Sequence, residues 1–169
     1  MSFLASAYTK LRAVFSTPTM NATQAWQAGE GKAAHAFWLY AAPVNMVLGR
    51  DSFFLSAPVP LSLSSDESTS LIESLNQHFA NDGYHFYCLN DVWFLGLEVD
   101  PKITTTHVDQ VVNHDIAPYL PTGEGALAWA ALQNEIQMLL FKHPVNEARE
   151  AQGLPVMNSL WCYGLGAAA

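Results

Sequence analysis

The polar side chains best suited to binding or catalysis are concentrated near the C-terminal end of this 169-residue chain. They comprise amides, a carboxylate, a guanidinium, an imidazole, a hydroxyl and an indole, in the order Asn134, Glu135, Gln137, His143, Asn146, Arg149, Asn158, Ser159 and Trp161. Amides donate and accept hydrogen bonds, and a guanidinium can hold a carboxylate or phosphate through two parallel bonds. These residues could therefore form a pocket for a small polar or anionic ligand.

The same residues could instead form an internal network that holds two helices against a C-terminal strand. Most buried polar groups are hydrogen-bonded within the protein, which favours the network. Under both interpretations, short loops bring the helices together and place Glu135 within ion-pair distance of Arg149. We expect that pair to be surrounded by Asn134, His143, Asn146 and Asn158.

A third interpretation is catalytic. His143 begins a predicted loop between two helices and is the best candidate for acid–base chemistry. Together with Glu135 and Arg149 it would serve a phosphate-ester-processing enzyme of the mutase or hydrolase type. The chain has no Gly-rich phosphate loop, no Gly-x-Ser-x-Gly elbow and no His-Glu-x-x-His motif. Binding is therefore the primary expectation and catalysis the alternative.

Metal binding is not expected from the histidines. His107 and His114 would lie on one helix face about 10.5 Å apart, whereas a zinc ion lies about 2.0–2.2 Å from each nitrogen or oxygen ligand. The other candidates are interpreted as ordinary surface or half-buried residues: His35, His78 and His85. We expect no metal and no cofactor.

Composition limits the classes of partner. Apolar residues make up 50% of the chain and charged residues 13%, enough apolar material for a sizeable core. Seven Lys and Arg against 15 Asp and Glu give a formal charge of −8. Nucleic acids and anionic membranes are bound through clustered basic side chains, so neither is an expected partner.

The location is expected to be cytoplasmic. Cys88 and Cys162 lie in aromatic runs, so we interpret them as buried, reduced thiols, which fit a reducing compartment. Lys10 and Arg12 follow the apolar start of the chain, whereas a secretory signal carries its positive charges first. No window reaches the roughly 18 apolar residues of a membrane span.

Hydrophobic periodicity predicts one compact α+β unit, made of an N-terminal helical segment (1–34) and an α+β domain (35–166). The sheet is expected to consist of antiparallel hairpins with helices packed on it. Strands are predicted at 37–40, 44–48, 52–55, 84–89, 92–99 and 157–163, with Pro43 dividing the first two and a bulge at Gly96. Helices are predicted at 4–15, 21–32, 64–79, 105–112, 125–142 and 145–152, with 115–121 extended between two prolines.

Two features of these elements carry specific expectations. The helix at 125–142 is apolar around more than half of its circumference, so it should lie centrally with Ile136, Leu139 and Leu140 buried. The aromatic content exceeds what one face of a small sheet can hide, counting Phe37, Trp38, Phe53, Phe54, Trp93 and Phe94. We therefore expect a homodimer, formed through a sheet edge or the second face of the sheet.

A longer pattern runs through the C-terminal polar residues. It reads Leu-Gln-Asn134-Glu135-Ile-Gln137-Met-Leu-Leu-Phe-Lys-His143-Pro-Val-Asn146-Glu147-Ala-Arg149-Glu, followed by Leu154-Pro-Val-Met-Asn158-Ser159-Leu-Trp161. Earlier matching segments are Asn-Asp82-Gly83 and Asp115-Ile-x-Pro118-x-Leu120-Pro121. Over about 37–166 the chain resembles a bacterial family known as RpfE-type regulatory proteins, some of whose members are called cofactor-independent phosphoglycerate mutases.

The resemblance implies a role in bacterial pathway control. Members of that family continue beyond the matching region, so we expect this chain to be a short or truncated member. Enzymes called cofactor-independent phosphoglycerate mutases use two divalent metals, a nucleophilic serine and many Asp and His ligands, a density that this sequence lacks. The mutase activity is therefore not carried over. We expect a regulatory or binding protein that binds a small polar ligand or a protein partner.

Overall fold

A computed structural model describes residues 20–169, so the helix predicted at 4–15 lies outside the described residues. The fold is α+β, as predicted, and is built on a five-stranded antiparallel sheet. Strand β1 (Phe37–Leu48) pairs along one edge with β4 (Val92–Leu97) and along the other with β5 (Ser159–Ala167). Strand β3 (Tyr84–Leu89) extends the sheet beyond β4, and β2 (Phe53–Ser56) pairs with the last residues of β1.

The prediction that Pro43 divides the first strand is wrong, because β1 continues through it. Proline interrupts a sheet where a neighbouring strand needs its missing N–H. Here β4 pairs with β1 only as far as Tyr40, so it does not reach Pro43. The hydrogen bond that Pro43 does form is through its carbonyl, which accepts the Leu61 N–H. The missing donor therefore breaks no bond to β4.

The hairpin β3–β4 forms where predicted. Asn90 and Asp91 have φ values of 51° and 64°, which suit the tight turn that matches the twist of two antiparallel strands. Gly96 does not form the predicted bulge, since β4 keeps its register with both neighbours. The irregularity lies in β1, between Trp38 and Tyr40 opposite β5.

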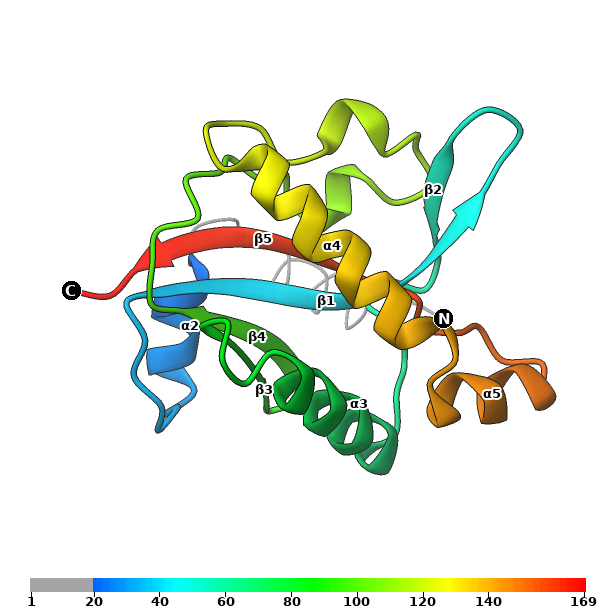
Figure 1. The fold of residues 1–169 in the computed structure, drawn as a ribbon, viewed down its shortest axis with the longest axis horizontal. Coiled ribbons are helices and arrows are strands. Elements are labelled where there is room, and N and C mark those ends of the chain that lie inside the picture. The colour runs from blue at the N-terminus through cyan, green and yellow to red at the C-terminus, as the bar shows by residue number, and fades with distance from the viewer. Residues whose placement is uncertain (1–19) are drawn as a thin grey trace, which may run out of the picture.

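Two long helices cover one face of the sheet. They are α3 (Ser65–His78) and α4 (Ala126–Phe141), and α4 crosses β1 and β5 in Figure 1. The core on this face includes Ile136 and Leu140, as predicted. Leu139, which was expected to be buried with them, is only partly buried.

A short helix covers the opposite face. Because successive residues of a strand point to opposite sides, Trp38 and Phe94 project away from α3 and α4. Helix α2 (Ala22–Ala28) packs Trp26 against both of these side chains. Both faces of the sheet are therefore covered, at least in part, by residues of the chain itself.

The connection that precedes α4 differs from the predictions, whereas the one that follows it agrees with them. The helix expected at 105–112 is reduced to a 3-10 turn, η1 (Val108–Gln110). The segment expected to be extended, 115–121, contains another, η2 (Ala117–Tyr119), because Pro118 fits the first turn of a helix. After α4 comes α5 (Pro144–Ala151), and Gly153 follows it in the predicted left-handed conformation.

Two further observations concern surfaces. No helix within residues 20–169 combines the length and apolar composition needed to cross a membrane. Of the aromatic residues that suggested a homodimer, Trp38, Trp93 and Phe94 are buried within the chain itself, whereas Phe53 is exposed.

Candidate functional site

Arg149 and Glu135 do not meet, so the predicted ion pair is wrong. Arg149 is buried, and its Nη1 donates to both carboxylate oxygens of Glu67, at 3.1 and 3.0 Å. Glu135 instead lies 2.8 Å from His78 Nε2 on the surface. Glu67 and His78 stand at opposite ends of α3, about 16 Å apart along the helix axis. Helix α3, which no local pattern links to the C-terminal cluster, therefore keeps the two predicted partners apart.

His143 caps α5. Its Nδ1 accepts the Val145 N–H at 3.1 Å, and its Nε2 lies 2.8 Å from Ser74 Oγ. A backbone N–H can donate only to an unprotonated nitrogen, so the imidazole is neutral with its proton on Nε2. Burial lowers the pKa of His143, which agrees with that state. The ring is thus engaged at both nitrogens inside the protein.

Two amides of the predicted cluster bind backbone groups. The Asn146 side chain donates to the carbonyls of Leu140 and Met157 and accepts the Met157 N–H. The Asn158 side chain accepts the Met46 N–H and donates to the Met46 carbonyl. The hydrogen bonds of these two amides join the C-terminal segment to the end of α4 and to β1.

The trio proposed for catalysis is not assembled. His143, Glu135 and Arg149 each bind a different residue of α3 and lie apart from one another. Asn134, expected beside the same ion pair, is exposed on the outer side of α4. The geometry therefore does not support the use of these residues as one acid–base and phosphate-binding group.

The other predicted residues lie along a cleft between α4 and β5. Its volume is about 340 Å³. Asn134, Gln137 and Trp161 line it, and Gln137 Nε2 makes a long hydrogen bond of 3.4 Å to the buried Ser159 Oγ. Trp161 donates its indole N–H to the Thr106 carbonyl at 2.9 Å. Of the nine residues in the sequence pattern, three line this cleft and Ser159 lies beside it, whereas Glu135, His143, Asn146, Arg149 and Asn158 do not line it.

Most of the cleft wall is apolar, and two polar atoms beside it lack partners. Met46, Phe53 and Ile116 are among its apolar lining, and none of the described residues that line it is charged. Trp129 Nε1 and Gln133 Oε1 are buried without a hydrogen-bond partner among the described residues. A buried polar atom without a partner costs about 1–3 kcal/mol. The cleft wall therefore combines mostly apolar side chains with the amides of Asn134 and Gln137, and two unpartnered polar atoms are buried behind it.

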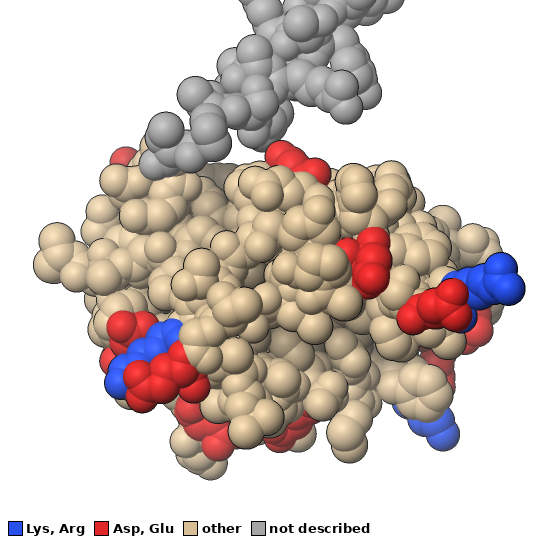
Figure 2. Space-filling model, turned by 90° about the horizontal axis from the view of Figure 1, so that it is seen from above, with Lys and Arg blue, Asp and Glu red and all other residues tan. Residues whose placement is uncertain are grey.

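The outer side of α4 continues this apolar surface. Leu127, Met138 and Phe141 are 86%, 77% and 76% exposed, and the spacing of an α-helix places them on the side opposite Ile136. Asn134 lies on the same stripe and also lines the cleft. Figure 2 shows broad uncharged areas on the side of the molecule seen there, with Lys and Arg only near its margins.

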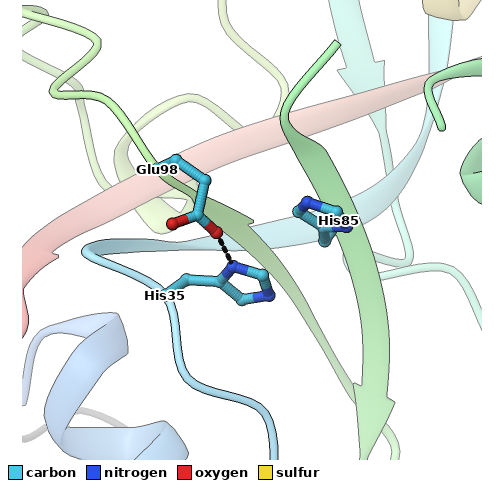
Figure 3. Close-up of side chains that lie close together, drawn as sticks. All are labelled: His35, His85 and Glu98. Atoms are coloured by element: carbon cyan, nitrogen blue, oxygen red, sulfur yellow. Dashed lines mark hydrogen bonds and ion pairs between the residues drawn. The ribbon is translucent and has the colours of Figure 1, made fainter. Parts of the chain in front are cut away.

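A separate cluster lies on the sheet face that α2 covers. His35 precedes β1, His85 belongs to β3, and Glu98 follows β4 (Figure 3). His35 Nδ1 contacts a Glu98 carboxylate oxygen, and His35 Nε2 lies 2.7 Å from Tyr87 Oη. Both histidines were interpreted from sequence as ordinary residues. The register of the β3–β4 hairpin, which pairs His85 with Gly96, was the one available signal.

Comparison with known proteins relates the chain to proteins named as mutases. It is 28% identical over 107 residues to the 2,3-bisphosphoglycerate-independent phosphoglycerate mutase of Methanosarcina mazei, a match that covers 62% of this chain and 27% of that protein. It is 28% identical over 127 residues to a probable enzyme of the same name from Geobacter sulfurreducens, with 74% and 32% covered. The mutase of Methanosarcina barkeri is 30% identical over 111 residues, with 63% and 27% covered.

These similarities are distant and partial. The matched region spans about a quarter to a third of the length of the curated relatives. No family model matches the chain, and no solved structure matches it. The resemblance to phosphoglycerate mutases is thus confirmed as a distant likeness, whereas neither the RpfE-type family nor a regulatory role has support from these comparisons.

Proposed function

We propose that this chain is a docking module of a phosphoester-processing protein assembly. It binds a protein partner through the outer side of α4 and the adjoining cleft, and the partner carries the phosphotransfer centre. The observation that carries the proposal is that α4 is apolar on two opposite sides, one packed on the sheet and one exposed. A helix that is apolar on all sides is normally buried. The exposed apolar side of α4 therefore indicates a surface that another protein covers.

The proteins to which this chain is similar suggest what kind of partner covers the exposed side of α4. The relatives named phosphoglycerate mutases are about three to four times longer than the region they share with this chain, since that region is 27–32% of their length. In a chain of that length the shared region has a much larger body beside it. We therefore identify the partner as a mutase-like protein body that presents apolar side chains to α4.

The chemistry of the cleft also favours a protein over a phosphate ester. A phosphate ester carries about two negative charges, and burying charge without a cation is costly. None of the described cleft residues is charged, and the buried guanidinium of Arg149 is already bound to Glu67. An apolar side chain accompanied by a backbone amide would suit the cleft, because its wall is mostly apolar and the amides of Asn134 and Gln137 line it as hydrogen-bonding groups.

A second copy of the chain is the competing occupant. It would fulfil the expectation of a homodimer, although through a helix rather than through the sheet. The exposed stripe on α4 is roughly symmetric about Asn134, with Leu127 seven residues before it and Phe141 seven residues after. In an antiparallel pair of α4 helices, two Asn134 amides would meet and could hydrogen-bond to each other. The pathway-control role implied by the family resemblance is not part of the proposal.

The test uses the Methanosarcina mazei mutase from which the matched segment has been removed, once circular dichroism has shown that this mutase body is folded. Binding of the chain to the mutase body is measured by isothermal titration calorimetry, with and without the double substitution Leu127→Glu and Phe141→Glu. We expect binding by the unaltered chain and none by the double variant, because both glutamates would be buried at the interface. The chain alone is expected to show no phosphoglycerate mutase activity.

Val99→Glu is the matched control, since Val99 is 76% exposed but lies outside α4. This variant should bind the mutase body like the unaltered chain. Mutase activity in the chain alone would contradict the proposal. A stable dimer in sedimentation that Met138→Glu dissociates, together with no binding to the mutase body, would assign the surface to a second copy instead.

A further inference from the structure

We propose that His35, His85 and Glu98 form a binding site for a divalent transition-metal ion, with Zn²⁺ as the best-matched ion. Among residues 20–169 they are a group in which one ligand atom from each side chain lies within 4.8 Å of the others. The site lies on the face of the sheet away from α4. It is independent of the proposed docking surface and departs from the expectation that no metal is bound.

The fold brings the two imidazoles together through a glycine. Gly96 on β4 pairs with His85 on β3, so the two residues occupy one face of the sheet side by side. A Cβ atom at position 96 would overlap His35 Cδ2 and Cγ, which shows that the His35 ring occupies the space a side chain would fill. Because Gly96 has no side chain, the His35 ring can lie against the His85 ring, and their centroids are 4.6 Å apart.

The distances are close to those of a metal site. In tetrahedral coordination with bonds of about 2.0–2.2 Å, neighbouring ligand atoms lie about 3.3–3.6 Å apart. The limit of 4.8 Å means that no pair of ligand atoms needs to approach by more than about 1.2–1.5 Å, whereas His35 Nδ1 and the Glu98 oxygen, now hydrogen-bonded, must move slightly apart. Side-chain rotation alone can supply a movement of that size, so the backbone need not change.

The hydrogen bonds around His35 suit a ligand. Metal-bound histidines usually hold their second ring nitrogen in a hydrogen bond, which fixes the tautomer. Tyr87 Oη lies 2.7 Å from His35 Nε2 and can accept a hydrogen bond from an N–H at that nitrogen. The lone pair is then on Nδ1, the nitrogen that faces Glu98 in Figure 3. An ion between His35 and Glu98 would replace the hydrogen bond that joins them.

Two side chains must adjust for the ion to bind. The rings of His35 and His85 are stacked, with 15° between their planes, so one ion cannot lie in both planes until His85 turns. No hydrogen bond among the described residues holds the His85 ring. The Glu98 side chain is 55% exposed, whereas that of His35 is 8% exposed. The protein therefore supplies one fixed ligand, two movable ones and an entry path from solvent.

The donor set selects the class of ion. Mg²⁺ and Ca²⁺ prefer oxygen ligands, whereas imidazole suits zinc, copper, iron and nickel. Two histidines and one carboxylate with an open fourth position are a known ligand set for zinc. We therefore assign the site to an ion of the zinc type that keeps a water molecule or another external ligand.

Co²⁺ tests this assignment, since it adopts zinc geometries and absorbs visible light when bound. The untagged full chain is titrated with Co²⁺, and Zn²⁺ is then added as competitor. We expect one ion per chain, the intense absorption of tetrahedral cobalt, and displacement by Zn²⁺. His85→Ala and Glu98→Gln should each weaken binding at least about tenfold, as loss of a metal-site residue does.

Two further variants separate the site from adventitious binding. His107→Ala removes a surface histidine whose Nδ1 lies 3.6 Å from the Asp109 carboxylate, and it should leave the affinity unchanged. Gly96→Ala should weaken binding although it removes no ligand, because the new methyl group displaces the His35 ring. Circular dichroism establishes that each variant is folded. Absence of cobalt binding, or equal binding by the folded His85→Ala and Glu98→Gln variants, would overturn the proposal.

Discussion

Arg149 donates to both carboxylate oxygens of Glu67 although 82 residues separate them in the chain. Glu67 is also the third residue of α3, where its side chain accepts the Ser64 N–H as part of a capping box. Burial raises the pKa of the Glu67 carboxyl, but the hydrogen bond from the Ser64 backbone and the Arg149 guanidinium more than offset this, so its pKa is lowered overall. One carboxylate therefore both starts α3 and binds α5.

Replacing Arg149 by Ala should destabilise the protein by about 3 kcal/mol, because it leaves Glu67 without its cation in a partly buried position. The matched control is Glu135→Ala, which removes the exposed pair with His78. Surface pairs contribute about 0–1 kcal/mol. The free energies of unfolding are measured by urea denaturation. Equal losses in the two variants would show that the Arg149 pair is no stronger than a surface contact.

The stability of the protein should fall as the pH is lowered below about 6.5, the ordinary pKa of histidine. The pKa of His143 is lowered in the folded protein, so between the two pKa values the unfolded chain binds a proton that the folded chain does not. Protonation of Nδ1 would also break the bond from the Val145 N–H.

The measurement is the free energy of unfolding, from a pH above the ordinary histidine pKa to one below the lowered pKa of His143. In His143→Asn, which keeps a capping side chain but cannot titrate, the part of the pH dependence due to this residue should vanish. The same slope in both proteins would assign the pH dependence to other groups.

Replacing Leu140 by Ala should cost about 2–5 kcal/mol, the usual range for a fully buried leucine. Leu139→Ala should cost less, because Leu139 is only partly buried at the edge of the same core. Met138→Ala should change the stability of the isolated chain by less than about 0.5 kcal/mol, as exposed positions do. Thermal unfolding of the three variants gives the ranking, and a different order would contradict the orientation of α4.

Asn146→Ala should destabilise the protein by about 3 kcal/mol, since it leaves the buried Met157 N–H without its acceptor and removes one donor each from the carbonyls of Leu140 and Met157. Asn134→Ala is the matched control, an exposed amide on α4 with an expected change below about 0.5 kcal/mol. Denaturant midpoints of the two variants compare them directly. A small loss for Asn146→Ala would mean that water takes over its hydrogen bonds.

Local signals predicted local structure well. The Ser64–Glu67 capping box marked the start of α3, and Asn90–Asp91 marked the turn of the hairpin. Pro43 led to a wrong strand boundary because its effect depends on whether a strand pairs beside it, which only the sheet topology decides.

The candidate sites depended on contacts between distant segments. Residues 134–161 do contain the polar side chains that form hydrogen bonds and ion pairs in this part of the fold. The partners of Arg149 and Glu135, however, both lie on α3, far away in sequence. His35 could not be linked to His85 and Glu98 from its position in the chain, because its place depends on the empty space above Gly96.

The side-chain amide of Asn158 forms the pair of hydrogen bonds that a backbone peptide group forms in a sheet. It gives and receives hydrogen bonds with Met46 as a neighbouring strand would, one residue before β5 begins at Ser159. The N–H and carbonyl of Met46 are therefore not available to a strand of another molecule. Unpaired strand edges are the places where chains associate into aggregates. Loss of this amide would open one step of the ladder to other molecules, so its effect would appear in the solubility of the protein as well as in its stability.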